Sequence, residues 1–234
     1  MALLSGARWA HAVPAADGAP NPWFTWRYVR DNRGDLEAAI QEHLLLTVET
    51  LAIGLAIAFP LALLAFRYRR LSGLVLGTAG VLYTIPSLAL FAFLAPFTGI
   101  GRRTVLIGLV MYALLVLVRN ILTGLESVPD EVRESAIGMG YGRLRMLWRV
   151  ELPVAAPAIL AGIRIATVTT VALVTVGVIV GNGGLGQLMM RGFYNNFYRA
   201  EIVTASVLTI ALALLLDLLL AAFTRAVTPW TRGR

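Results

Sequence analysis

Long apolar segments with almost no charge constrain this chain more than any other feature. Only three charged side chains, Glu49, Arg164 and Asp217, occur in 111 residues of apolar sequence, and the other 123 residues contain 30. The apolar segments are residues 44–66, 74–96, 104–118, 154–180 and 202–224. A helix on a soluble core would show a polar face, which these segments lack. The sequence therefore predicts an all-α, polytopic membrane protein and excludes soluble, disordered and fibrous classes.

The lengths of the segments predict five transmembrane helices, because about 20 residues cross the hydrocarbon core. The segment 104–118 is too short, so its helix is expected to continue past Arg119, with that side chain reaching an interface, to residue 122. Five crossings place the two termini on opposite sides of the membrane. The predicted membrane domain is 44–224, with spans at 44–66, 74–96, 104–122, 154–180 and 202–224.

The N-terminal part is predicted to lie outside the membrane domain, as an extracytoplasmic tail and helix over residues 1–43. Residues 1–25 are rich in alanine and proline and lack the pattern of a signal peptide. From Trp26 to His43 the pattern favours a charged interfacial helix flanked by aromatic residues, although a solvated arm fits nearly as well. Residues 225–234 are predicted to be a cytoplasmic tail.

Arginine supplies all of the positive charge, and its distribution predicts the orientation. The arginines cluster at the ends of apolar segments, which is typical of membrane proteins and argues against nucleic-acid binding. Eleven lie on the side that carries the loops 67–73 and 119–153 and the C-terminus, against six near the spans on the other side. The bias predicts a multi-pass protein with its N-terminus outside and its C-terminus in the cytoplasm.

The residue inventory argues against catalysis and metal binding in this chain. There is no cysteine, and the two histidines, His11 and His43, precede the first predicted span. An intramembrane enzyme would need embedded histidine, cysteine or paired acids, so no catalytic or metal residue is predicted. Gly181–Gly186 matches the dinucleotide pattern G-x-G-x-x-G, but it follows a 27-residue apolar run that is too long for a strand. We expect a tight glycine turn at the outer end of the fourth span instead.

The loop 125–153 is predicted to form two short amphipathic helices on the cytoplasmic surface. Acidic residues follow Pro129 in the first turn of a helix that ends at Gly138 or Gly140, where a side chain would clash in the turn. A second helix over Arg143–Val150 presents Leu144, Leu147 and Trp148 on one face, and Pro153 is expected to stop it and begin the next span. Such a projection can fit a groove in a partner protein.

The same loop resembles the EAA loop of ABC-importer permeases, whose pattern is Glu-Ala-Ala, three residues, Gly, nine residues and Ile-x-Leu-Pro. The matching positions, with serine for alanine and valine for isoleucine, are Glu134, Ser135, Ala136, Gly140, Val150, Leu152 and Pro153. The resemblance implies a type I ABC importer permease fold and a loop that couples to an ATPase. The chain has no G-x-x-x-x-G-K-[ST] motif, so ATP and magnesium would be bound by that partner.

The resemblance extends over residues 43–217, where the chain is similar to permeases of osmoprotectant importers. It is carried by segments such as Tyr83–Leu90, Gly162–Arg164 and Gly181–Gly186. It implies a bacterial cell-membrane importer for glycine betaine, carnitine, choline or a related quaternary amine, or another small solute handled in the same way. The implied partners are two ATPases, an identical or homologous second permease, an extracytoplasmic binding protein and membrane lipid.

Pro86 and Ser87 interrupt the second predicted span. Proline removes a helical hydrogen bond and frees a carbonyl, which a membrane tolerates only against protein or a water-filled cavity. We predict that Tyr83, Pro86 and Ser87 border the substrate pathway, with the rings of Phe91 and Phe93 as further candidates for binding a quaternary ammonium. A kink that serves only packing fits the sequence equally well.

Two charges deep in the predicted spans, Arg164 and Asp217, favour a structural ion pair, because embedded charges face the bundle interior and pair. Glu49 lies near the end of its span and is expected to reach the interface. A self-contained secondary transporter is disfavoured, since the five spans show no internal repeat and few acids are available for coupling.

Overall fold

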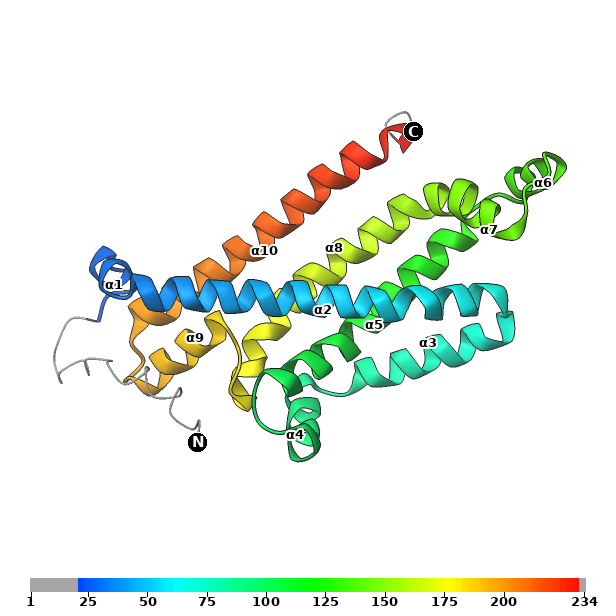
Figure 1. The fold of residues 1–234 in the computed structure, drawn as a ribbon. Helices are drawn as coiled ribbons and strands as arrows, with labels where there is room; N and C mark the ends of the chain where they lie inside the picture. The colour runs from blue at the N-terminus through cyan, green and yellow to red at the C-terminus, as the bar shows by residue number, and fades with distance from the viewer. Residues whose placement is uncertain (1–20, 232–234) are drawn as a thin grey trace, which may run out of the picture.

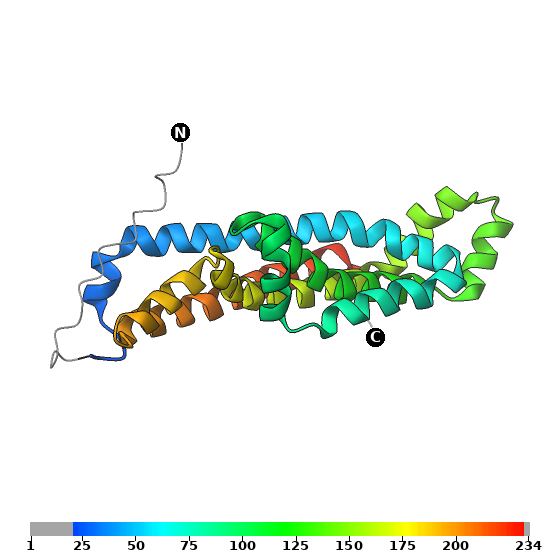
Figure 2. The ribbon, with the colours of Figure 1, turned by 90° about the horizontal axis from the view of Figure 1, so that it is seen from below.

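A computed structural model describes residues 21–231 of the protein, and every regular element in that range is helical. The long helices lie roughly side by side in an elongated bundle (Figures 1 and 2). The α-helices are α1 (Trp26–Asp31), α2 (Arg33–Arg67), α3 (Arg69–Thr84), α4 (Ser87–Thr98), α5 (Arg102–Glu126), α6 (Asp130–Gly138), α7 (Arg143–Met146), α8 (Leu152–Val176), α9 (Leu185–Tyr194) and α10 (Arg199–Val227). A π-helical turn covers Leu147–Glu151, and 3₁₀ turns cover Gly177–Val180 and Pro229–Thr231.

The two ends of the bundle differ in what they carry (Figure 1). Helices α1 and α9 lie at one end, here called the α1 end, and α6 and α7 lie at the opposite end, the α6 end, together with the turn from α2 to α3. Within residues 21–231, four helical segments are long and apolar enough to cross a membrane: Arg33–Arg67, Arg102–Glu126, Arg143–Val180 and Arg199–Val227. The pair α3 and α4 can supply a fifth, broken span.

The segment predicted to form one interfacial helix over Trp26–His43 is divided in the structure between two helices, α1 and α2. Helix α1 begins after Thr25, whose hydroxyl accepts a hydrogen bond from the Tyr28 N–H, and ends at Asp31. From Arg33 the chain already belongs to α2, which continues without a break through the first predicted span. The charged start of α2 is helical because one side of it packs on α9 and α10 through Leu36 and Ala39. Residues 1–20 lie outside the described part of the chain.

The second predicted span is not a single helix. Helix α3 ends at Thr84 and α4 begins at Ser87, with an angle of 97° between them. Pro86 lacks an N–H and cannot continue the α3 hydrogen-bond pattern. The break therefore redirects the chain much more sharply than an ordinary proline kink.

The prediction that Pro153 stops the second loop helix is wrong. The chain is helical without interruption from Arg143 to Val180, and the Leu152 N–H donates to the Leu147 carbonyl across a π-helical turn. Pro153 lies in the first turn of α8, where its missing N–H costs little. The wider π turn lets the loop helix merge with the membrane helix.

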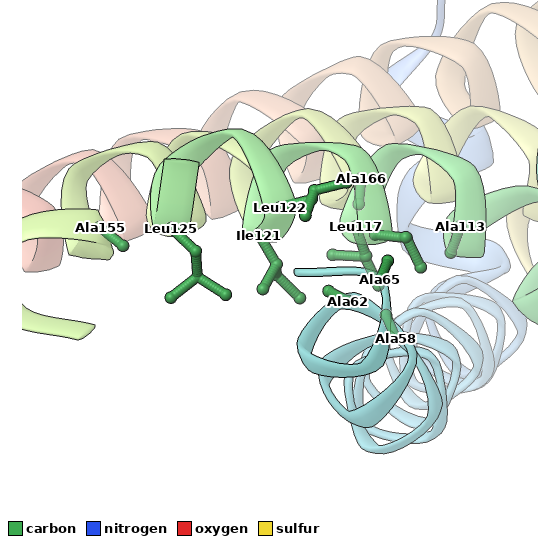
Figure 3. Close-up of a cluster of buried hydrophobic side chains, with 11 residues drawn as sticks. Ala58, Ala62, Ala65, Ala113, Leu117, Ile121, Leu122, Leu125, Ala155 and Ala166 are labelled. Carbon is green, nitrogen blue, oxygen red and sulfur yellow. The ribbon is translucent and has the colours of Figure 1, made fainter. Parts of the chain in front are cut away.

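The core of the bundle forms where α2, α5 and α8 meet. Figure 3 shows Ala58, Ala62 and Ala65 of α2 facing the larger side chains of α5, including Leu117 and Ile121, which are fully buried. Small residues on one helix let the neighbouring helix approach closely, which is how membrane helices gain packing contacts. This core holds the α6 end together.

We predict that Gly162→Ala destabilises the subunit, whereas Gly77→Ala does not. A Cβ atom added at Gly162 of α8 would lie 2.3 Å from Cβ of Asn120 on α5, and at Gly77 of α3 it would meet nothing within 4 Å. Overpacking of this kind costs about 1–3 kcal/mol. Thermal unfolding of both variants in detergent checks the difference, and equal midpoints would contradict the close α5–α8 approach.

Candidate coupling site and substrate pathway

Helix α6 has a defined start and a defined end. It begins after Pro129, with Asp130 and Glu131 in its first turn. It ends in a Schellman motif, in which the Tyr141 N–H donates to the Ala136 carbonyl at 3.0 Å and the Gly140 N–H donates to the Ile137 carbonyl at 2.9 Å. Gly140 has φ +77°, a left-handed conformation that favours glycine, and a Cβ there would meet nothing within 4 Å. The constraint at Gly140 is therefore the backbone conformation and not the clash expected from the sequence.

The loop presents an apolar surface, called here the docking surface, at the α6 end. Beneath it, Ala136 and Met146 are buried. The motif residues Glu134 and Ser135 are exposed, and Val150, Leu152 and Pro153 are half-buried where the loop joins α8. The docking surface consists of the exposed side chains of Val132, Ile137, Met139, Leu144 and Trp148. Exposed apolar side chains on short helices are typical of a protein-binding site.

Arg133 connects α6 to the rest of the molecule. Its guanidinium donates to the carbonyl of Leu125 at the end of α5 at 2.8 Å and to Oε1 of Glu151 in the π turn at 3.2 Å. It also pairs with Asp130 and lies 5.3 Å from the centre of the Phe66 ring on α2. The motif pattern includes neither Arg133 nor Glu151, and sequence reasoning missed both.

The break between α3 and α4 brings the predicted pathway residues together with a tyrosine of α5. The Tyr112 hydroxyl donates to the carbonyl of Ile85, which the break has freed, and the Tyr112 ring lies edge-on to Tyr83 with centroids 5.8 Å apart. Ser87 is half-buried at the first position of α4. The break thus receives the polar partner that a freed backbone group needs in a membrane.

The phenylalanines that follow the break lie apart from it. Phe91 is fully buried against Gly108 of α5, so its ring is not available to a solute. Phe93 is exposed and packs beside Phe97. Tyr83 is therefore the aromatic candidate that remains next to Pro86 and Ser87.

The structure brings the two deep charges together. Nε and Nη2 of Arg164 on α8 donate to the two carboxylate oxygens of Asp217 on α10, at 2.9 and 2.8 Å. A two-pronged pair of this kind fixes orientation as well as charge balance. Glu49 pairs with Arg102 at 2.7 Å, which ties α2 to the start of α5.

Buried groups that the sequence did not reveal hold the α1 end. His43 is fully buried; its Nδ1 accepts from the Leu185 N–H at 3.3 Å, so Nε2 carries the proton and donates to the Val171 carbonyl at 3.0 Å. Gly184, with φ +51°, packs against the His43 backbone. The glycine segment 181–186 forms the turn after a 3₁₀ turn and runs into the start of α9. Within residues 21–231 no strand precedes it, which contradicts a dinucleotide site.

Arg191 of α9 forms a second buried connection. It donates to Asp35 of α2 at 2.8 Å and pairs with the buried Glu201 of α10. Burial alone would lower the pKa of Arg191, but the hydrogen bonds to Asp35 and Glu201 hold it above its usual value. One feature of the sequence could have indicated these polar contacts. Acidic residues recur every seven positions on one face of α2, at Asp35, Glu42 and Glu49. Each of the three binds a different segment.

No group of three or more histidine, cysteine or acidic side chains that could hold a metal ion occurs within residues 21–231. A bundle of membrane-length helices with an exposed apolar surface on short helices at one end is typical of a membrane protein that binds a partner protein. The fold and the docking surface thus define the class of protein.

Comparison with known proteins identifies the family within that class. The family described as binding-protein-dependent transport system inner membrane component matches residues 51–233. The chain belongs to this family of ABC-importer permeases, which are multi-pass inner-membrane proteins without catalytic activity of their own. ATP is bound by partner ATPase subunits.

The relatives share most of their length with this chain. A glycine betaine/carnitine/choline transport system permease, OpuCD of Bacillus subtilis (strain 168), is 36% identical, with 86% of this chain and 88% of that protein covered. The osmoprotectant import permease OsmW of Salmonella typhimurium (strain LT2) is 36% identical, with coverages of 88% and 97%. A solved chain of the inward-facing MetNI methionine ABC transporter is similar with TM-score 0.74 and 25% identity, covering 82% of this chain and 96% of that one.

Proposed function

We propose that this permease imports a quaternary-amine osmoprotectant such as glycine betaine, carnitine or choline. The observation that carries the proposal is the set of relatives with 32–36% identity over 86–88% of the chain, whose names describe transport of glycine betaine, carnitine or choline, or of an osmoprotectant. The Tyr83 ring beside the helix break supports it, because aromatic faces attract quaternary ammonium groups. Pro86 and Ser87 then border the pathway.

The working transporter, in this proposal, contains two permease subunits, two ATPases and an extracytoplasmic binding protein. The motif residues Glu134, Ser135, Ala136, Gly140, Val150, Leu152 and Pro153 shape the coupling loop. The docking surface on α6 and α7 receives an ATPase, since its exposed apolar side chains need a protein cover. The Arg164–Asp217 pair holds α8 against α10 and does not contact the solute.

Uptake into proteoliposomes tests the proposal. The permease is reconstituted with its ATPase and binding protein, and radiolabelled glycine betaine, carnitine, choline and methionine are compared. We expect ATP-dependent uptake of at least one amine and no uptake of methionine, with a hydrolysis-deficient ATPase as control. Uptake of methionine alone would refute the substrate class but leave the permease function standing.

The same proposal predicts the orientation in the membrane. ATP is cytoplasmic, so the α6 end, toward which α10 also runs, faces the cytoplasm and α1 lies outside (Figure 1). A reporter fused after Arg234 is expected to be cytoplasmic, and one at the N-terminus extracytoplasmic. Both reporters on the same side would mean that α3 and α4 together do not cross the membrane.

A cysteine at Ser87 is expected to react with a small water-soluble thiol reagent, at a rate that changes when the ATPase is trapped with ATP. The reason is the position of Ser87 at the first residue of α4, next to the Ile85 carbonyl and the Tyr112 hydroxyl, which form a polar spot at a helix break between apolar helices. The chain has no native cysteine to remove. Leu88 on the same helix and Leu218 on α10, whose side chains are exposed, serve as lipid-facing controls, whereas Leu90 is buried and cannot serve as one. Equal inertness at all three positions would favour a packing kink.

A further inference from the structure

Few polar contacts connect α6 to the bundle, although the bundle would have to follow any movement of α6. Within residues 21–231, the side-chain hydrogen bonds that join α6 to other elements come from Arg133. Ser135 donates only within α6, to the Glu131 carbonyl at 2.7 Å. Most of the remaining α6 surface is exposed. A force applied to α6 by a partner therefore reaches the bundle through Arg133, through apolar packing under Ala136 and through the chain itself.

The Arg133 side chain reaches all three helices of the core. It contacts α5 at the Leu125 carbonyl, the start of α8 through Glu151, and α2 through the Phe66 ring. Leu125 belongs to the same buried cluster in which α2, α5 and α8 meet. A planar guanidinium with several donors suits such a site, and a lysine, which has a single point charge, cannot replace it.

The two acidic partners of Arg133, Glu151 and Asp130, differ in how much of their side chains is exposed. The side chains of Arg133 and Glu151 are 23% and 11% exposed, whereas that of Asp130 is 88% exposed. Exposed ion pairs contribute little, while loss of one member of a buried pair leaves the other charge without a partner. Glu151, rather than Asp130, therefore fixes the position of Arg133.

We propose that Arg133, held by Glu151, is the positioning residue that makes α6 move as one body with the ends of α2, α5 and α8. The inference rests on the proposed docking of the ATPase at α6 and deepens it. Docking is done by the exposed apolar side chains, and transmission is done by the contacts of Arg133 with Glu151 and with the Leu125 carbonyl. Without these contacts, α6 still binds the ATPase but can rotate or slide against the bundle.

The test uses the complete transporter with Arg133→Gln, Glu151→Gln, the double variant and Asp130→Asn. Asp130→Asn is the matched control, because it removes the exposed partner of the same arginine and leaves Leu125 and Glu151 in place. The readout is the number of solute molecules transported per ATP hydrolysed, together with copurification of the ATPase. We expect the ratio to fall about tenfold in each glutamine variant, a value within the usual range of couplings between sites. Copurification and the Asp130→Asn ratio should stay unchanged.

The double variant shows whether the two residues act as a unit. If they do, Arg133→Gln combined with Glu151→Gln is no worse than either single change. A spin label at a cysteine replacing Glu131 gives a second readout: its mobility should rise in both glutamine variants at equal ATPase binding. Unchanged transport ratios in the single variants, or a double variant whose losses simply multiply, would overturn the inference. Failure of the wild-type permease to bind any ATPase would instead refute the proposed function.

Discussion

Gly140→Val is expected to lower solute-stimulated ATPase activity and transport by about tenfold or more, while the subunit still inserts in the membrane. The cause is the backbone: at φ +77° a residue with a side chain is strained, and a β-branched one most of all. The left-handed conformation costs about 1–2 kcal/mol for an L-residue, which corresponds to roughly tenfold. The Schellman motif then opens, and α7 no longer holds its place beside α6.

Gly138→Val provides the matched control for this prediction. Gly138 lies in the same loop, has ordinary helical geometry and, like Gly140, has nothing within 4 Å of an added Cβ. The two variants add the same side chain two positions apart and differ in backbone strain. ATPase stimulation by loaded binding protein in proteoliposomes is the measurement. Equal losses in both variants would assign the effect to bulk on the docking surface and not to the turn.

Arg164→Leu is expected to remove most of the folded subunit from the membrane. Asp217 would keep its charge in an apolar segment after losing both hydrogen-bond donors. An unpaired carboxylate in that setting is costly, whereas an apolar pair is not. The double variant Arg164→Leu with Asp217→Leu should therefore recover most of the wild-type amount.

Size-exclusion profiles of fluorescently tagged subunits, extracted in mild detergent, measure this amount. Arg70→Leu near the start of α3, at an exposed position, is a control for loss of an arginine outside the apolar segments. Normal amounts of Arg164→Leu alone, or no recovery in the double variant, would show that the pair does not hold α8 and α10 together. Transport by the recovered double variant would further argue against a direct role in solute movement.

The membrane helices and α6 were predictable because their signals are local. Apolar runs mark the helices α5 and α10 to within a few residues, but α2 begins well before its apolar run and the second run is divided between α3 and α4. Pro129 with its following acids marks the first residue of α6 at Asp130. Helix α9 was missed because it is a short helix between a glycine turn and the next span. Its stability comes from Leu185 and Leu188, which are buried against α2 and α10 only once the bundle has formed.

The polar contacts were less predictable because their partners are distant in sequence. His43 binds groups that follow it by 128 and 142 residues, and nothing near His43 marks the backbone atoms it meets. The Arg164–Asp217 pair could be anticipated, since both charges are rare exceptions within apolar runs. Arg133 is one of many loop arginines, so only its surroundings in three dimensions distinguish it.

The π-helical turn at Leu147–Glu151 has a geometric consequence for the loop that precedes it. Each residue of an α-helix advances the direction of the side chains by about 100°, and a π turn contains one residue more than an α turn. Deleting one residue from this segment would let the turn close as ordinary α-helix and leave α7 and α6 in nearly the same direction, whereas deleting two residues would swing them by roughly that angle about the axis of α8. The extra residue between Arg143 and Leu152 therefore lets the junction absorb a one-residue deletion without changing the direction in which the permease presents its cytoplasmic loop.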